Sequence, residues 1–198
     1  MSIPDQASIT LPPGSSWNSG SHWHEIHTEY LKIEAGAART VLGGIFKGPV
    51  RPSDGVVTVP RGTIHEWHRS EGDDLDSELV VTEWTMPSDG QKEIFFRNID
   101  GLVLNTHHWI DVKYWREQAL LEDIEVEIRL LGWKMDNFPI VLNGRWPAVV
   151  RRVATYFALL WTIAYACFED MTASRGLKGL HKQYTPPSLR ERLPEQLS

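Results

Sequence analysis

Residues 22–36 read HWHEIHTEYLKIEAG, and residues 60–69 read PRGTIHEWHR. Together these stretches hold five of the eight histidines in the chain. His22 and His24 are separated by one residue, so their side chains share one face if the segment is a β-strand. Glu29 lies five residues after His24 and begins the next β-rich run. Imidazole and carboxylate groups are therefore concentrated in two short segments.

His65 extends this set, because it follows a turn marked by Pro60 and Gly62. Three imidazoles and one carboxylate form a borderline-soft ligand set that suits Fe, Mn, Ni, Cu or Zn. Four protein ligands leave positions open for substrate, water or O2 if the ion is six-coordinate. Brought together, His22, His24, Glu29 and His65 would form a site for a divalent transition metal. The alternative is a set of buried polar residues without a metal, which would be costly.

The sequence changes character near residue 88. Before it, β-rich runs at 28–35, 38–46, 55–59, 63–69 and 77–86 are bounded by Gly, Pro, Asp or Ser. Short strands at this spacing, with no helical period between them, are typical of an antiparallel sandwich or barrel. The fold class that we expect is mainly β.

Helical periodicity follows residue 89. Ile94, Phe95, Ile99 and Leu102 fall on one face of a predicted helix. Further helices are expected over 114–131 and 147–168, and the polar, proline-rich end of the chain begins at residue 171.

The helix predicted at 147–168 contains 16 residues, 153–168, without a charge. A spanning helix needs about 20 residues, and Arg151 and Arg152 interrupt the apolar run. We expect this helix to pack on the barrel or on a dimer partner. Membrane contact through 148–168 is the less favoured alternative.

Composition restricts the class of partner. The formal net charge of -6 argues against nucleic acid, because phosphate binding needs a basic face. The single cysteine, Cys167, cannot form an internal disulfide, and the N-terminus has neither a basic start nor an apolar run. We expect a cytoplasmic protein that acts on a small molecule.

The motif spacing resembles that of the cupin superfamily. The segment HWHEIHTEYLKIEAG is similar to the first cupin motif, with two histidines, a glutamate and then Gly36. The segment PRGTIHEWHR is similar to the second motif. Ser16 and Asp54 stand where the family usually has glycine, and Arg69 stands where it usually has asparagine.

This resemblance implies a jelly-roll barrel over 1–88 with a divalent transition metal inside it, held by His22, His24, Glu29 and His65. The barrel would be followed by a helical extension over 89–170, packed on the barrel or at a dimer interface. A tail over 171–198 would end the chain. Because few strands precede Leu11, a partner subunit is expected to complete the sheet in a homodimer. If Glu29 and His65 point into the barrel, Leu31, Ile33 and Trp67 do so too. They would fill the core, line a substrate pocket, or do both.

The order of elements also resembles short cupins in which a phenylalanine-rich helix, like EIFFRNIDGL here, follows a single barrel. Some fungal members accompany polyketide-type secondary-metabolite pathways and are called cupin-domain oxidoreductases. The resemblance implies an Fe(II)-dependent oxidoreductase or oxygenase acting on a small phenolic, enolic or keto metabolite. A non-redox Lewis-acid enzyme with Zn, Mn or Ni is one alternative. A small-molecule-binding cupin without turnover is the other.

His27 lies between the ligand candidates. It could support the metal site as a hydrogen-bond partner of a ligand or act as an acid in the pocket. A position in a surface loop is the interpretation that we favour from sequence.

Overall fold

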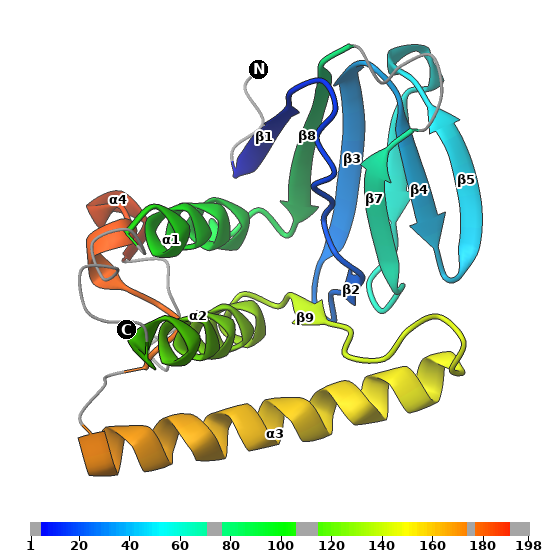
Figure 1. Cartoon of the computed structure of the whole chain (residues 1–198). Coiled ribbons are helices and arrows are strands. Elements are labelled where there is room, and N and C mark those ends of the chain that lie inside the picture. The colour runs from blue at the N-terminus through cyan, green and yellow to red at the C-terminus, as the bar shows by residue number, and fades with distance from the viewer. Residues whose placement is uncertain (1–4, 71–76, 106–114, 174–176, 191–198) are drawn as a thin grey trace.

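The computed structural model describes residues 5–70, 77–105, 115–173 and 177–190. Two antiparallel sheets face one another, and the helices lie at one end of them (Figure 1). The first sheet has the order β1 (Gln6–Leu11), β8 (Leu79–Met86), β3 (Thr28–Ala35) and β6 (Val56–Val59). The second has the order β5 (Ile45–Val50), β4 (Ala38–Leu42), β7 (His65–Arg69), β2 (His22–Trp23) and β9 (Phe138–Pro139). The predicted fold class, mainly β with a helical C-terminal extension, is confirmed, and the β part consists of two facing antiparallel sheets.

Strand alternation places the core between the sheets. In β3, Leu31 and Ile33 are buried, and in β8 so are Leu79 and Val81, whereas the residues between them are partly exposed. Trp67 of β7 joins this cluster from the facing sheet. The same alternation directs Glu29 and His65 inward, each with 1% exposure. The period-2 pattern of apolar residues therefore also sets where the candidate ligands point.

The helices are α1 (Gln91–Asn105), α2 (Trp115–Lys134), α3 (Ala148–Ala173) and the short α4 (Pro187–Arg190). Two 3-10 turns, Pro52–Asp54 and Lys182–Tyr184, complete the regular structure of the described residues. The predicted stripe of α1 packs as expected, because Ile94 is buried in a second cluster to which Phe95, Ile99 and Leu102 contribute. In Figure 1, α2 lies between α1 and α3.

The strand β9 links the two halves of the chain. It follows α2 in sequence, and it pairs with β2 so that His22 is opposite Pro139 and Trp23 is opposite Phe138. The second sheet thus contains residues from both sides of position 88. The division into units at 1–88, 89–170 and 171–198 stays a prediction.

Gly36 occupies the turn between β3 and β4 with φ of +74°, and an added Cβ would lie 2.6 Å from the carbonyl oxygen of Glu78. Gly14 has nearly the same φ of +73°, but no atom lies within 4 Å of its added Cβ. The two glycines thus share a left-handed backbone and differ in the space around them.

We predict that Gly14→Ala lowers the free energy of unfolding by about 1 kcal/mol, the cost of the left-handed conformation alone. Gly36→Ala should lower it by about 2–4 kcal/mol, because a clash with backbone atoms is added. Urea denaturation of both variants measures the difference. Equal losses would show that the contact with Glu78 carries no cost.

Candidate metal centre

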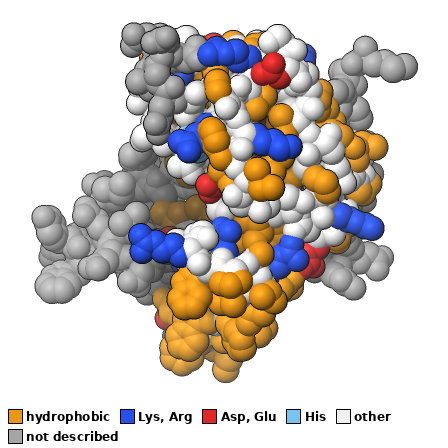
Figure 2. Space-filling view, turned by 90° about the vertical axis from the view of Figure 1, so that its right-hand side faces the viewer, with side chains coloured by type: hydrophobic (Ala, Val, Ile, Leu, Met, Phe, Trp, Pro, Cys, Tyr) orange, Lys and Arg blue, Asp and Glu red, His pale blue; other side chains and the backbone are white. Residues whose placement is uncertain are grey.

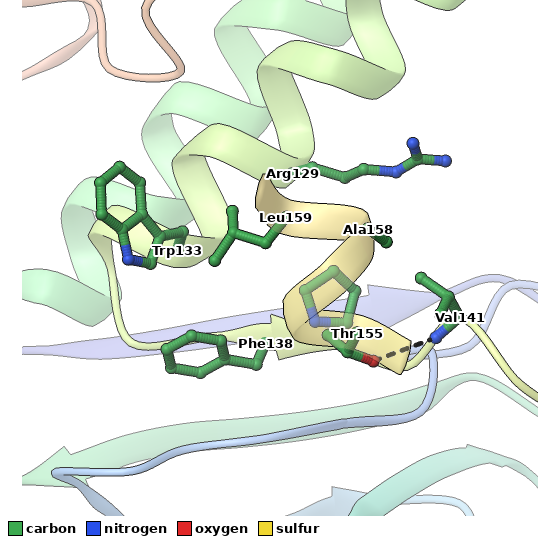
Figure 3. Close-up of a pocket in the computed structure, with 8 residues that line it drawn as sticks. Arg129, Trp133, Phe138, Val141, Thr155, Ala158 and Leu159 are labelled. Atoms are coloured by element: carbon green, nitrogen blue, oxygen red, sulfur yellow. Dashed lines mark hydrogen bonds between the residues drawn. The ribbon is translucent and has the colours of Figure 1, made fainter. Parts of the chain in front are cut away.

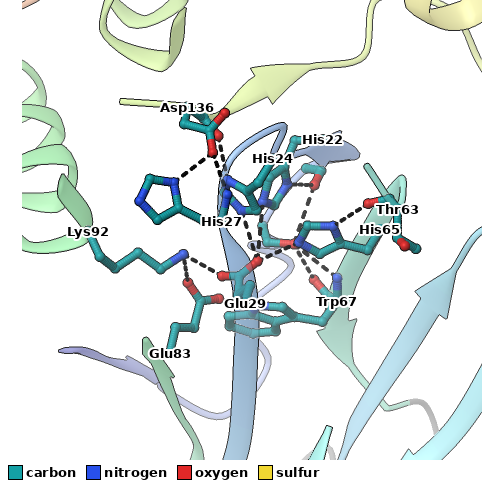
Figure 4. A network of polar contacts seen from close by, with 12 residues as sticks. His22, His24, His27, Glu29, Thr63, His65, Trp67, Glu83, Lys92 and Asp136 are labelled. Atoms are coloured by element: carbon teal, nitrogen blue, oxygen red, sulfur yellow. Dashed lines mark hydrogen bonds and ion pairs between the residues drawn. The ribbon is translucent and has the colours of Figure 1, made fainter. Parts of the chain in front are cut away.

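Three strand segments bring the four predicted ligands together. His22 and His65 face one another across β2 and β7, His24 follows β2, and Glu29 comes from β3 of the other sheet. One ligand atom of each lies within 4.8 Å of the others, and all four side chains are buried. Figure 4 shows the rings gathered about the Glu29 carboxylate. The group can hold a metal ion; its assignment as the ligand set stays a prediction.

Backbone carbonyls fix the orientation of each imidazole. Nδ1 of His22 lies 2.8 Å from the carbonyl oxygen of Gly20, and Nδ1 of His65 lies 2.9 Å from that of Thr63. Nδ1 of His24 lies 2.5 Å from the carbonyl oxygen of Asp136. A carbonyl only accepts, so in the neutral form of each ring Nδ1 carries the proton and Nε2 keeps the lone pair. This is the tautomer that a metal-binding histidine needs.

The three Nε2 atoms converge on one oxygen. Oε2 of Glu29 lies 3.8 Å from Nε2 of His22, 3.0 Å from Nε2 of His24 and 2.5 Å from Nε2 of His65. Four electron-rich atoms so close together in a buried site require a positive centre. Protons satisfy that requirement incompletely, whereas a divalent cation satisfies all four atoms at once. The donor set therefore fits a transition metal.

The pKa values of the imidazoles respond to this crowding. Burial and the neighbouring His65 lower the pKa of His22 to about 3. Burial also acts to lower the pKa of His65, but the Glu29 carboxylate outweighs it and raises that pKa above the usual value. His22 is thus held neutral, the state in which imidazole binds metals.

A buried lysine secures the other oxygen of Glu29. Lys92 of α1 donates from Nζ to Oε1 of Glu29, and its Nζ lies 2.9 Å from Oε2 of Glu83. Glu83 in turn accepts from Nε1 of Trp67 at 2.5 Å. Lys92 is 5% exposed and Glu83 is 3% exposed (Figure 4). With Oε1 bound to an ammonium group, only Oε2 of Glu29 faces the imidazoles.

Electrostatics keep this ion pair charged. Burial favours the neutral amine, but the Glu29 and Glu83 carboxylates overcome that effect and raise the pKa of Lys92 above its usual range. Burial also acts to raise the pKa of Glu29, yet Lys92 and the histidines hold it well below the usual value. For Glu83 burial prevails, and the pKa is raised.

Sequence reasoning missed both Lys92 and Glu83, although each carried a signal. Glu83 alternates with the buried Val81 in β8, so a carboxylate stood on the inward face of a predicted strand. Lys92 precedes Phe95 by three residues and Ile99 by seven, which places it on the apolar stripe of α1. A charged residue on an apolar stripe indicates a buried partner.

Asp136, which follows α2, supports the ligands from outside the barrel. Its carboxylate accepts hydrogen bonds from the backbone N–H groups of residues 25–27 and lies 2.7 Å from Nδ1 of His27. Nε2 of His27 lies 3.0 Å from Oδ2 of Asp89. The expectation that His27 lies in a surface loop was wrong, because this ring is 2% exposed between two carboxylates. Asp136 carried no recognisable sequence signal.

A cleft of about 810 Å³ reaches the site. Three residues of the buried network, His22, Glu83 and Lys92, contribute to its wall. Phe95, Phe96 and other residues of α1, together with β1 and β9, form much of the rest. The predicted pocket residues Leu31, Ile33 and Trp67 belong to the core cluster and do not line this cleft. Their proposed pocket role stays a prediction.

Comparisons with known proteins reach only part of the chain. No protein-family model matches it, and no curated protein matches it significantly. Similar solved structures include the capsular polysaccharide assembling protein CapF from Staphylococcus aureus, with 20% identity and a TM-score of 0.34 over 42% of this chain and 25% of that chain. A predicted oxalate decarboxylase from Thermotoga maritima has 25% identity and a TM-score of 0.33, over 40% of this chain and 63% of the other.

A cupin 2 domain-containing protein from Halorhodospira halophila has 20% identity and a TM-score of 0.33, over 40% of this chain and 49% of that chain. The chain therefore spans less than two thirds of the length of each of these proteins.

The His27 environment predicts a dependence of stability on pH. Burial acts to lower the pKa of His27, but hydrogen bonds to Asp136 and Asp89 raise it from 6.5 to about 9. The raised pKa stabilises the fold fully below pH 6.5, and this contribution is lost as the pH rises through 9. Between pH 6 and pH 10, the free energy of unfolding of the parent should therefore fall by about 3 kcal/mol more than that of the variant His27→Gln.

Urea denaturation between pH 6 and 10 measures this effect as the difference between the two proteins, so that other titrating groups cancel. Parallel curves for the two proteins would contradict the assignment of a protonated His27.

Removing Lys92 should leave two buried carboxylates without a counter-ion. We predict that Lys92→Met lowers the free energy of unfolding of the metal-free protein by about 3–5 kcal/mol. Adding Glu83→Gln to that variant should recover part of the loss, because one of the two unpaired charges is removed. Thermal denaturation of the single and double variants measures both effects, and a single variant as stable as the parent would contradict the buried pair.

Proposed function

We propose that the chain is a metal-dependent enzyme that acts on a small, partly apolar organic molecule bound in the 810 Å³ cleft. The observation that carries this proposal is that one wall of the cleft includes His22, whose Nε2 belongs to the candidate metal site. A ligand in the cleft would therefore lie beside the metal. His22, His24, Glu29 and His65 would hold the ion, for which we favour Fe(II).

The lining of the cleft supports a substrate with an apolar body and one polar end. Phe95, Phe96 and Ile99 of α1 provide aromatic and aliphatic surface. Glu83 and Lys92 provide charge near the metal site. Such a lining fits a phenol, an enol or a ketone of the polyketide type, with its oxygen directed at the metal site and its ring at the phenylalanines.

An Fe(II) ion at this site would supply redox chemistry with O2 as the oxidant. A dioxygenation balances without another reductant, because both oxygen atoms enter the substrate and the substrate supplies the four electrons. The Lys92 ammonium group, at the edge of the cleft, would favour the anionic form of a phenolic or enolic oxygen. The phenylalanine side chains would exclude water from the bound ring.

Non-redox chemistry at the same metal is the second candidate, and one observation favours it. Lys92 and Glu83 form an acid–base pair on the cleft wall, 2.9 Å apart. With Zn, Mn or Ni as a Lewis acid, that pair could move a proton on the substrate in an isomerisation, dehydration, cyclisation or decarboxylation.

Oxygen uptake separates the two candidates. We predict that protein loaded with Fe(II) consumes O2 when catechol or pentane-2,4-dione is added, and that metal-free protein does not. Under argon, both the O2 uptake and the consumption of the probe should stop. Probe turnover at an unchanged rate under argon would exclude the oxygenase reaction. Loss of that turnover in Glu83→Gln would then favour the Lewis-acid candidate.

A further inference from the structure

The two carboxylate oxygens of Glu29 have separate partners. Oε1 accepts a hydrogen bond from Nζ of Lys92, whereas Oε2 lies within 3.8 Å of Nε2 of His22, His24 and His65. Glu29 is buried, so the surrounding protein rather than bulk water supplies these partners. A counter-ion that only neutralised Glu29 would not need to be confined to one of its oxygens. The contacts instead leave one oxygen bound to an ammonium group and direct the other at the candidate ligand atoms.

Lys92 of α1 is held in this position from three sides. Its Nζ donates to Oε1 of Glu29, lies 2.9 Å from Oε2 of Glu83 and lies 5.6 Å from the centre of the Phe96 ring. Glu83 of β8 is itself fixed, because it accepts from Nε1 of the buried Trp67 at 2.5 Å. Figure 4 shows this row of side chains ending at the Glu29 carboxylate. The ammonium group therefore cannot move away without leaving a buried carboxylate unpaired.

The charge of Lys92 affects how a metal ion can bind Glu29. A cation at Oε2 is attracted by the carboxylate, but a cation that also approached Oε1 would meet the ammonium group, and like charges repel strongly in a buried site. Moving the ammonium group aside would break its hydrogen bonds to Glu29 and Glu83, which is costly in a buried network. Binding through Oε2 alone leaves these contacts in place. The network therefore favours binding through one oxygen of Glu29.

We propose that Lys92 is a positioning residue: by holding Oε1, it makes Glu29 a one-oxygen ligand and leaves two neighbouring positions of the ion open toward the cleft. This role rests on the proposed metal site and concerns which ligands that site can take. Three imidazole nitrogens and Oε2 fill four positions of a six-coordinate ion, whereas a second oxygen from Glu29 would fill a fifth. Two open positions admit a chelating anion with two oxygen donors, such as a catecholate or the enolate of a 1,3-diketone.

The cleft is the route by which such an anion can approach. The cavity between α3, the end of α2 and β9 holds only about 20 Å³ (Figure 3), and another beside His24 and His27 holds about 10 Å³. Each is close to the space of one water molecule. The cleft of about 810 Å³ is lined by His22, Glu83 and Lys92. Of these three cavities, only the cleft is large enough for an organic anion, and it leads to the network that fixes Glu29.

The exposed apolar surface of α3 lies apart from this route. Phe157, Leu160 and Trp161 are between 62% and 74% exposed, and in Figure 2 hydrophobic side chains gather at the base of the molecule, where α3 lies. No described residue of α3 belongs to the wall of the cleft. Among the residues that the structure describes, none of the helices combines the length and the apolarity that a membrane span requires. Small polar probes would not collect on this surface, so they suit a test of the metal site.

Two such probes, titrated into the cobalt(II)-loaded protein, test the role of Lys92. Acetohydroxamate has two oxygen donors and azide binds through one atom, and the visible absorption of cobalt reports only what binds to the ion. Both probes bind as singly charged anions, so a change of charge near the ion affects their affinities alike. The variant Lys92→Met/Glu83→Gln removes the ammonium group without leaving Glu83 as an unpaired charge. Glu83→Gln alone is the matched control, because it keeps the contact of Lys92 with Glu29.

The parent and Glu83→Gln should bind acetohydroxamate more tightly than azide. In Lys92→Met/Glu83→Gln, Oε1 is free to join the ion, and the ratio of the two affinities should fall by at least about tenfold, because a second donor adds affinity only where a second position is open. The absorption bands of the cobalt protein without a probe should also change in this variant and not in the control.

An equal ratio in all three proteins would show that Lys92 does not limit Glu29 to one oxygen. A fall in Glu83→Gln as large as that in the double variant would assign the effect to Glu83 and would likewise overturn the role of Lys92.

A crystal structure of the cobalt-loaded parent is a second measurement that needs no variant. It should show cobalt at Oε2 of Glu29 and Lys92 still at Oε1. Cobalt bound to both oxygens would contradict the role of Lys92 and leave the proposed metal enzyme standing. A parent chain that binds no cobalt would instead contradict the metal site, and the role of Lys92 with it.

Discussion

The convergence of three imidazole Nε2 atoms on one carboxylate oxygen is the constraint on which the rest of the site depends. Electron-rich atoms of this kind repel one another in a buried, low-dielectric interior. The fold holds them together with directional contacts, since each Nδ1 is tied to a backbone carbonyl and Oε1 of Glu29 is tied to Lys92. A divalent cation would relieve the repulsion, and the cleft beside His22 would give a small molecule access to it.

The helical half of the chain is therefore part of the site. Lys92 comes from α1, and β9 extends the sheet that carries His22. Asp136 fixes His24 through its carbonyl and the β2–β3 connection through its carboxylate. A barrel made only of the first 88 residues would lack the counter-ion of Glu29, and it would lack the connection that orients His24.

The sequence predicted the parts that depend on local periodicity. Alternation within β3, β7 and β8 determines which side chains point inward, and the mainly β fold was predicted from such short β-rich runs. The meeting of the four ligand candidates was predicted from the resemblance of two segments to the cupin motifs. Contacts between residues far apart in the sequence could not be predicted from it. Asp136 lies 109 residues after His27, and nothing local in either segment indicates their pairing. The apolar run in α3 was visible, but sequence alone did not show that its larger residues face outward.

Elemental analysis of the purified protein, paired with the variant His24→Ala, tests the central claim most directly. The account predicts about one equivalent of a divalent transition metal per chain in the parent, with iron favoured, and its loss in a variant that remains folded. Zinc, manganese or nickel at the same stoichiometry would keep the site and favour Lewis-acid chemistry. A folded parent that binds no metal after reconstitution with each of these ions would contradict the account, as would a variant with full metal content.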